Sequence, residues 1–248
     1  MAAITLNEFS KFRIALARIN EAAGNEFRDY FLKRPNGLAG VTTNEVAEYV
    51  YLLVTKYGEA SSELACQMYE MIAELEGVTI PAAIPAATPT KKEVYAAVNA
   101  TMGKSNNLDF IGSAVERLVK QVGQDTVLQN AIRDRAEYAW VPSGDTCAFC
   151  LALASRGWQE ATRAALKGGH AEHIHGNCDC AYSIRFKQST TVPGYEPNDY
   201  LKMYNAGGGS PQDKINAMRR AAYAQNKEKI NAQKRAAYAA RKAAEEGN

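Results

Sequence analysis

Apolar side chains recur at helical spacing near the start of the chain. In residues 5–34, Phe9, Phe12 and Ile19 are separated by three and by seven positions, which places them on one face of a helix. A Thr-x-x-Glu pattern that begins at Thr5 is typical of a capping box, in which two side chains satisfy N–H groups at a helix start. These features predict a helix over residues 5–34.

A second helical run follows another capping box, at Thr42, and continues to Gly77. Its apolar residues are so frequent that most of its circumference should be buried, as in a central core helix. Gly24 is a candidate point at which the first helix bends or splits, and Gly58 is a candidate interruption of the second. Cys66 stands alone in this second run and is interpreted as a small buried apolar residue.

Residues 81–90 contain three prolines in nine positions, a composition that predicts an extended connector. A third capping box, at Thr90, introduces a short helix, and residues 106–140 continue with one or two longer helical runs. The first half of the protein is therefore predicted to be nearly all helix.

After Pro142 the helical periodicity weakens, and Gly, Cys and His become frequent. The run CAYSIRF, at 180–186, alternates in the manner of a short strand. We predict a mainly α protein with a small loop-rich module that contains short strands. The predicted segments are a helical N-terminal region, a Pro-rich linker, a second helical region, a Cys/His module, an irregular arm and a basic helical tail, at 1–80, 81–90, 91–141, 142–186, 187–211 and 212–248.

The last segment contains an internal repeat. KINAMRRAAYAQN, from Lys214, recurs fifteen residues later as KINAQKRAAYAAR, from Lys229. From Gln212 onward the chain has nine Lys and Arg against four Asp and Glu, so this segment carries +5 and the remainder −3 of the total charge of +2. The period is not a multiple of seven, so the repeat favours an extended basic helix with two copies of one contact unit over a regular coiled coil.

Composition places the chain among folded proteins, because 46% of its 248 residues are hydrophobic. Its apolar stretches are interrupted by charges before they reach the roughly 18 residues that a membrane span needs, and its first residues lack the apolar core of a signal peptide. We therefore expect a soluble intracellular product with no membrane partner. Five cysteines in a chain of this size favour thiols or metal ligands over disulfides.

Four of these cysteines lie in two short patches that also contain histidine. The pattern is Cys147-x2-Cys150, then 24 residues, then His175-x2-Cys178-x-Cys180. Two ligands on one tight turn and two on another are typical of a tetrahedral zinc site. The favoured ligands are Cys147, Cys150, His175 and Cys180.

Five candidates compete for four positions, so alternatives stay open. Cys178 is the alternative to Cys180, because side chains two residues apart on either side of Asp179 need not both reach one metal, and His173 and His170 are weaker substitutes. A further alternative is that the clustered thiols bind no metal ion. A full set of soft ligands leaves no open coordination position, so we expect a structural Zn²⁺ and no catalytic residues.

At these motifs the chain resembles a known family. RDRAEYAWVPSGDTCAFCLALASRGW followed by HGNCDC is similar to the phage minor capsid, or MuF-like head morphogenesis, proteins, whose pattern is a Cys-x-x-Cys beside a helix of small residues and a later His-x-x-Cys-x-Cys. LVTKYGEASSELACQMYEMI and INAQKRAAYAARK extend the likeness to the helical half and the tail of actinobacteriophage members. The resemblance covers most of the chain.

This resemblance implies a virion protein of few copies, made in the host cytoplasm and associated with the portal inside the head. It implies a role in head assembly and in DNA packaging or delivery. The portal and other phage head proteins are the implied partners.

The basic tail suggests its own contacts. Arg219 and Arg220 in the first repeat, like Lys234 and Arg235 in the second, are followed three residues later by a tyrosine. The contact candidates are Arg219, Arg220, Tyr223, Lys234, Arg235 and Tyr238. A cationic patch beside an aromatic ring suits the phosphates of packaged double-stranded DNA. Docking on a protein groove and an inert solvated tail are the alternatives.

Two enzymatic hypotheses compete with a structural role. Paired Cys knuckles around a histidine also occur in zinc-finger nucleases, and the tail is basic, but such enzymes need a second His-containing constellation that three histidines hardly allow. A fused head-maturation protease is the third hypothesis, although neither Gly-x-Ser-x-Gly nor His-Glu-x-x-His is present. We expect no enzyme, with a nuclease-like or DNA-binding protein as the alternative.

Overall fold

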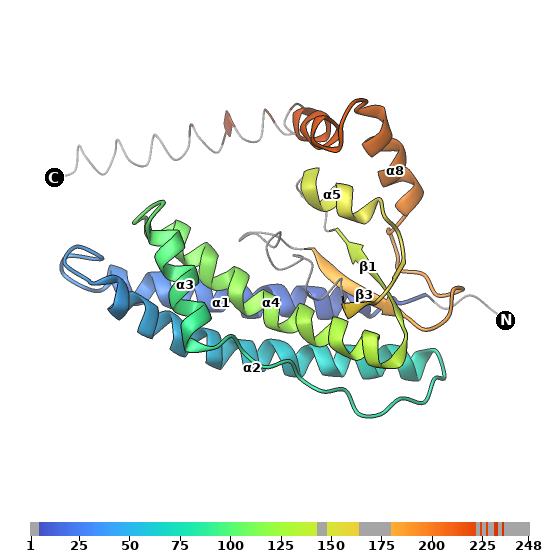
Figure 1. Cartoon of the computed structure of the whole chain (residues 1–248), viewed down its shortest axis with the longest axis horizontal. Coiled ribbons are helices and arrows are strands. Elements are labelled where there is room, and N and C mark those ends of the chain that lie inside the picture. Colours follow the sequence, from blue (N-terminus) through green and yellow to red (C-terminus); the bar gives the residue numbers. More distant parts are fainter. Residues whose placement is uncertain are drawn as a thin grey trace. The chain divides into compact units, whose positions relative to one another are not determined.

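The structure is a computed structural model of the chain. It describes residues 5–142, 148–163 and 180–221, together with 224, 227, 231, 232 and 235. Within these residues the protein is mainly helical with one small sheet, which confirms the predicted mainly α class with short strands, whereas the zinc-stapled character of the small module stays a prediction (Figure 1). None of the described helices is long and apolar enough to span a membrane.

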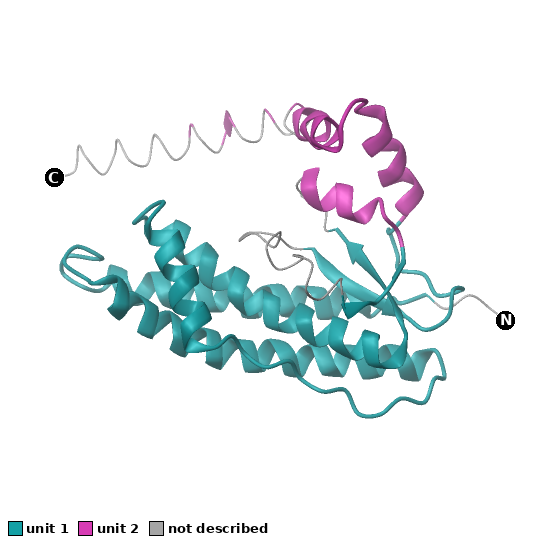
Figure 2. Cartoon of the chain, viewed as in Figure 1, with its two compact units in different colours: residues 1–143, 158–195 teal, residues 144–157, 196–248 magenta. Residues whose placement is uncertain are grey.

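The chain divides into two compact units (Figure 2). Unit 1 comprises residues 1–143 and 158–195, and unit 2 comprises residues 144–157 and 196–248. The sequence-based segment 142–186 therefore contributes residues to both units. Each unit is described separately below.

Four helices form the body of unit 1: α1 (Phe9–Leu32), α2 (Thr43–Leu75), α3 (Lys91–Met102) and α4 (Leu108–Asp134). α1, α2 and α4 pack along one another, and α3 packs on α2 and α4 (Figure 1). Their apolar stripes meet in one core, to which α2 contributes Val46, Val50 and Val54 from successive turns near its start. The core includes Phe27, Phe31, Val46, Val50, Val54, Val94, Val98, Ile111, Val115 and Val119.

Two of the three predicted capping boxes are confirmed. The hydroxyl of Thr42 accepts from the backbone N–H of Glu45, whose carboxylate accepts from the N–H of Thr42, and Thr90 pairs with Glu93 in the same way. The prediction at Thr5 is wrong. α1 begins at Phe9 without a side-chain cap, because the backbone at Thr5 is extended and forms a β-bridge with Thr191.

Neither predicted interruption occurs: α1 continues through Gly24, and α2 continues through Gly58. In α1 the glycine instead allows close approach. A Cβ on Gly24 would lie 2.2 Å from Oε1 of Glu116, and a Cβ on Gly112 would lie 2.8 Å from the guanidinium carbon of Arg28. These two side chains form an ion pair between α1 and α4, at 2.9 Å. The glycines therefore make room for a largely buried charge pair.

The Pro-rich connector is extended, as predicted, and it is attached to α4 by side-chain hydrogen bonds. Asn130 both donates to the carbonyl oxygen of Ile84 (2.8 Å) and accepts from its N–H (2.9 Å). The hydroxyl of Thr126 accepts from the N–H of Ala86 at 2.9 Å. Prolines remove backbone donors and hold the segment extended, so side chains of α4 provide its partners.

The helix expected to continue to residue 140 ends earlier, which corrects the sequence analysis. α4 ends at Asp134, Arg135 takes the left-handed conformation with φ of 55°, and β1 (Glu137–Val141) follows. β1 lies between β2 (Gln159–Glu160) and β3 (Ala181–Arg185) in an antiparallel sheet. The aromatic and β-branched residues of β1 favour a strand. The helical periodicity of the preceding residues predicted a helix here instead.

β3 confirms the strand predicted from CAYSIRF, but its burial differs from the expected alternation. Four consecutive residues are buried, because α2 and α4 cover the sheet in addition to its own neighbours. Tyr182 of β3 lies opposite Trp140 of β1, and their rings meet edge to face with centroids 4.8 Å apart. The strand is thus part of the main core.

A buried carboxylate links the end of α2 to the turn after β3. Glu76, which is 1% exposed, accepts from the backbone N–H groups of Phe186 (3.0 Å) and Lys187 (2.7 Å). The ammonium of Lys187 donates to the carbonyl oxygen of Glu76. Burial raises the pKa of Glu76, although the backbone hydrogen bonds and the nearby lysine oppose this shift.

In unit 2, two helices are labelled, α5 (Ala148–Ala154) and α8 (Pro197–Ala206), and residues 211–221 are also helical. The expectation of an irregular arm over 187–211 is therefore wrong for residues 197–206 and 211. Pro197 occupies the first turn of α8, where its missing N–H needs no partner, so proline starts this helix and does not break it.

Candidate metal centre and basic arm

Two of the predicted metal ligands, Cys150 and Cys180, lie among the described residues. Cys147, His175 and the alternative Cys178 lie outside them, as do His170 and His173. The described residues bring together no group of three or more His, Cys, Asp or Glu side chains that could hold a metal ion. The zinc site therefore stays a prediction, and its two described cysteines lie in different segments of the chain.

Cys150 lies in the middle of α5, in unit 2. Its side chain is fully buried, as is that of Ala154, and Ala148 is nearly so. The small side chains of this helix allow close packing around the thiol. α5 is followed by a turn in which Gly157 has a φ of 69°, a conformation that glycine adopts without strain.

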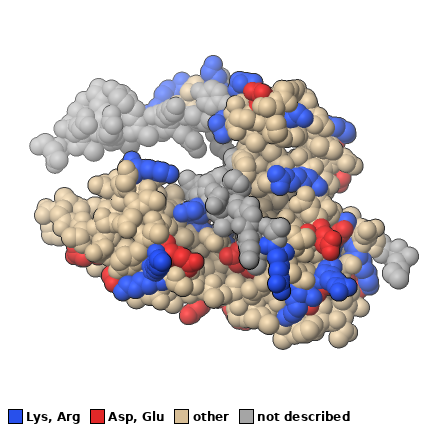
Figure 3. Space-filling model, in the orientation of Figure 1, with Lys and Arg blue, Asp and Glu red and all other residues tan. Residues whose placement is uncertain are grey.

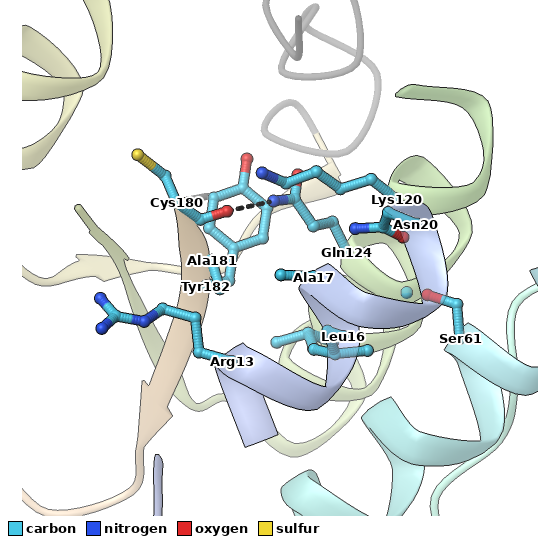
Figure 4. A pocket seen from close by; sticks show the side chains of 12 residues that line it. Arg13, Leu16, Ala17, Asn20, Ser61, Lys120, Gln124, Cys180, Ala181 and Tyr182 are labelled. Carbon is cyan, nitrogen blue, oxygen red and sulfur yellow. Dashed lines mark hydrogen bonds between the residues drawn. The ribbon is translucent and has the colours of Figure 1, made fainter. Parts of the chain in front are cut away.

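Cys180 directly precedes β3, in unit 1, and is 1% exposed. Its carbonyl oxygen accepts from Nε2 of Gln124, a residue of α4, at 3.4 Å. Figure 4 shows the thiol directed away from Gln124. The hydrogen bond therefore holds the backbone of Cys180 and leaves the direction of the sulfur independent of this contact.

A small cavity lies beside this hydrogen bond, between α1, α2, α4 and β3 (Figure 4). Three buried oxygen atoms at its wall have no hydrogen-bond partner among the described residues: Oδ1 of Asn20, Oγ of Ser61 and Oε1 of Gln124. Gly123 faces Ser61, and a Cβ at that glycine would lie 2.5 Å from the hydroxyl oxygen. The volume of about 20 Å³ is enough for one water molecule.

The chemistry of Cys150 and Cys180 fits zinc. Both are thiols, and neither forms a disulfide. A thiolate is the ligand that zinc prefers, and a buried thiolate needs a compensating positive charge, which a metal ion provides. Cys66 differs because it lies inside α2, where burial raises the pKa of its thiol to about 11, so it stays protonated. This confirms the prediction that Cys66 is a buried apolar residue.

Three of the six predicted contact residues of the basic arm are described. Arg219 and Arg220 belong to the helical stretch 211–221 and are exposed, and Arg235 is also helical and exposed. Tyr223, Lys234 and Tyr238 lie outside the described residues. The two exposed arginines of the first repeat are thus available for contacts with anionic surfaces or with a protein.

The start of this arm is held within unit 2. The ammonium of Lys214 lies 4.9 Å from the ring centroid of Tyr204 and donates to Oδ1 of Asn205 at 3.2 Å. Gly207 allows the approach, because a Cβ there would lie 2.7 Å from Cα of Lys214. The first basic residue of the repeat is therefore used for packing on α8, whereas Arg219 and Arg220 face solvent.

The helical body has a different charge distribution. On the face shown in Figure 3, Lys and Arg are interspersed with Asp and Glu over unit 1. Several of these charges form ion pairs, including Lys56 with Glu26 and Arg185 with Glu137. This mixed surface contrasts with the sequence of the tail, where Lys and Arg predominate.

The described elements define a mainly helical protein with a three-stranded antiparallel sheet and three buried thiols, at Cys66, Cys150 and Cys180. A family model described as VG15 protein matches residues 3–207. This range covers most of the chain, which therefore belongs to the VG15 protein family, a viral family consistent with a phage protein. Neither the curated proteins nor the solved structures gave a match to the chain.

Sequence reasoning did not find several residues that shape these sites. Gln124, Asn20 and Ser61 are separated widely along the chain and belong to no motif. Each is one polar residue of a long helix, and the three come to one cavity only through the packing of α1, α2 and α4. No pattern in the sequence marks them.

Proposed function

We propose that this protein is a structural minor capsid protein of the MuF-like class in a tailed phage, portal-associated inside the head. Its role is in head assembly and in DNA packaging or delivery, and it is not an enzyme. The observation that carries the proposal is the viral family match over residues 3–207, which includes the whole Cys/His region. The resemblance of the Cys/His motifs to MuF-like proteins supports the finer assignment.

The proposed zinc site is structural, with Cys147, Cys150, His175 and Cys180 as ligands and Cys178 as the alternative to Cys180. The two described ligands support it because they are buried thiols. Four soft ligands fill the tetrahedral shell of Zn²⁺, so the metal would contribute folding free energy and would not activate a water molecule.

The basic arm is proposed to contact other head proteins or packaged DNA. The exposure of Arg219 and Arg220 supports both partners. DNA would be bound through its phosphates, without reading of the base sequence, so its affinity would fall steeply with salt. Protein docking would depend more on the apolar residues of each repeat, such as Ile215.

Metal analysis of the purified full chain tests the zinc proposal. We expect about one zinc per chain in the wild type, and loss of that zinc with loss of folded structure when Cys147 and Cys150 are both replaced by serine. Cys66→Ala is the matched control, because its thiol is confined to α2, and it should keep the metal. Wild-type protein that folds fully without metal would refute the structural role.

The absence of enzymatic function is tested on the same preparation. Incubation with duplex DNA should leave the DNA intact. Hydrolysis that depends on the bound metal, and that is lost in the double cysteine variant, would instead favour the nuclease-like alternative.

The virion assignment needs the phage. Mass spectrometry of purified particles should find the protein at a few copies per virion. A variant that lacks residues 212–248 separates the functions of the arm: loss from the particle would indicate protein docking, whereas normal incorporation with loss of salt-sensitive DNA binding would indicate DNA contact. A protein missing from purified virions would refute the capsid assignment.

A further inference from the structure

A second cleft in unit 1 is lined by the same stretch of α4 as the cavity of Figure 4, but by other residues of that helix, and has a volume of about 700 Å³. Its walls come from three segments: the end of the extended connector, the first turns of α3 and the middle of α4. Its principal polar and charged residues are Thr88, Thr90, Glu93, Arg117, Gln121 and Asp125. The cleft is large enough for a stretch of peptide or a small ligand.

Arg117 is the unusual residue of this cleft. Its side chain is partly buried, and it has neither a carboxylate nor a hydrogen-bond acceptor among the described residues. Arg28, Arg133 and Arg185, by contrast, each form an ion pair. Burial lowers the pKa of Arg117, and the partial loss of hydration is not offset by a partner. A guanidinium in this position would be stabilised by an incoming anion.

The connector presents unpaired backbone at the same cleft. The N–H of Ala86 donates to Thr126, but the N–H groups of Ala87 and Thr88 have no acceptor among the residues that the structure describes. The connector contains neither helix nor strand here, and Figure 1 shows its trace drawn out between α2 and α3. An extended backbone with unpaired N–H and C=O groups is the surface on which a second extended chain can form main-chain hydrogen bonds.

The carboxylates of the cleft argue against nucleic acid as the ligand. Glu93 accepts from the N–H (2.8 Å) and the hydroxyl (2.7 Å) of Thr90, and these bonds lower its pKa, so it stays ionised. Asp125 adds a second acidic side chain. A run of phosphates would face these carboxylates with one arginine to balance them. A single carboxylate, placed against Arg117, avoids this repulsion and matches the planar guanidinium.

We propose that this cleft binds an extended segment of a partner protein and that an Asp or Glu of the segment pairs with Arg117. The proposal goes beyond the proposed function, since it defines a docking site in the helical body and does not depend on the metal site or on the basic arm. Arg117 is a contact residue for the partner and contributes little to the fold.

The contribution of Arg117 to the stability of the fold is measured first. Arg117→Gln should leave the denaturation midpoint unchanged or raise it slightly, because the variant removes a desolvated charge that has no partner. Arg28→Gln is the matched comparison, because it removes a guanidinium that pairs with Glu116, and it should lower the midpoint clearly. A large loss of stability in Arg117→Gln would show that the side chain serves the fold and would overturn the proposal.

Binding is then tested with a library of random ten-residue peptides displayed for selection on the immobilised full chain. Selected peptides should share an Asp or Glu at one position. A synthetic copy should lose about tenfold or more in affinity, by fluorescence anisotropy, when that acid is changed to its amide or when the protein carries Arg117→Gln. Lys92→Gln is the charge-matched control on α3, because Lys92 is exposed and outside the cleft, and it should bind as wild type.

Three outcomes would overturn the proposal. They are a selection that yields no binders, binders without a shared acid, and binders whose affinity is the same for wild type and Arg117→Gln. If a short DNA duplex competes with a selected peptide for the wild-type protein, and DNA binding is lost in Arg117→Gln, the site would instead be assigned to nucleic acid. None of these results would bear on virion incorporation or zinc content, so failure here is distinct from failure of the proposed function.

Discussion

Gly24→Ala is expected to destabilise the protein, although alanine is the better helix former. In α1 the added Cβ would lie 2.2 Å from Oε1, 2.6 Å from Cγ and 2.8 Å from Cδ of Glu116. These distances are shorter than van der Waals contact, so the carboxylate must move away from Arg28, with which it now pairs at 2.9 Å. The substitution thus disrupts an ion pair without changing either charged residue.

The magnitude follows from two opposing effects. Removal of one partner from a fully buried pair costs about 3–5 kcal/mol. The side chains of Arg28 and Glu116 are 19% and 10% exposed, and Arg28 keeps a contact with Asp109 at 3.3 Å, so we expect about 2–3 kcal/mol here. Alanine returns about 1 kcal/mol of helix propensity. The net loss in the free energy of unfolding should be about 1–2 kcal/mol.

Urea denaturation followed by circular dichroism measures this loss. Ala22→Gly is the matched control for helix propensity, because Ala22 is an exposed residue of the same helix, and it should cost about 1 kcal/mol. In a Glu116→Ala background the steric conflict is absent, so Gly24→Ala should be neutral or stabilising there. If Gly24→Ala stabilises the wild-type protein, the reasoning about the glycine and the ion pair is wrong.

Three further predictions concern the helix ends, the buried acid and the cavity. Thr42→Ala should cost about 1 kcal/mol in urea denaturation, because it removes the cap of α2, whereas Thr5→Ala should change little; equal effects would contradict the cap assignment. Burial raises the pKa of Glu76, so the folded state binds the proton of this carboxyl more tightly than the unfolded state does. The resulting contribution to stability is fully present below the pKa of an unfolded glutamate. It is lost as pH rises through the raised pKa of the folded state. The stability of wild type relative to Glu76→Gln should therefore fall as pH rises from about 4 to 7, and a difference that is constant or rises with pH would refute this. A high-resolution crystal structure should show one ordered water beside Gln124, and a dry cavity would contradict the assignment of its unpaired oxygens.

Local sequence features predicted much of the helical body. The capping boxes at Thr42 and Thr90 predicted two helix starts correctly, because Thr-x-x-Glu acts through contacts within four residues. The same pattern at Thr5 failed, since pairing of the backbone with Thr191 determines the local conformation there. Local patterns are thus reliable only where no distant segment competes for the same backbone groups.

The candidate sites also differ in whether short segments of sequence indicate them. The spacing of Cys147, Cys150, His175 and Cys180 indicated a metal site from neighbouring residues alone. Arg117 gave no comparable indication. In sequence it is one more charged residue on a helix, and it becomes informative only because the packing of α3 and the connector leaves it partly buried and without a partner.

The sequence by itself therefore determined the mainly helical class, the extended Pro-rich connector, the strand at β3 and the Cys/His pattern. Each depends on periodicity, proline geometry or ligand spacing, which are properties of short segments. Only the tertiary structure decided that α4 stops at Asp134, that Gly24 serves an ion pair and that Arg117 lacks one. These features depend on which residues meet across the fold, and a buried charge or a close helix contact has no energetic consequence until that meeting occurs.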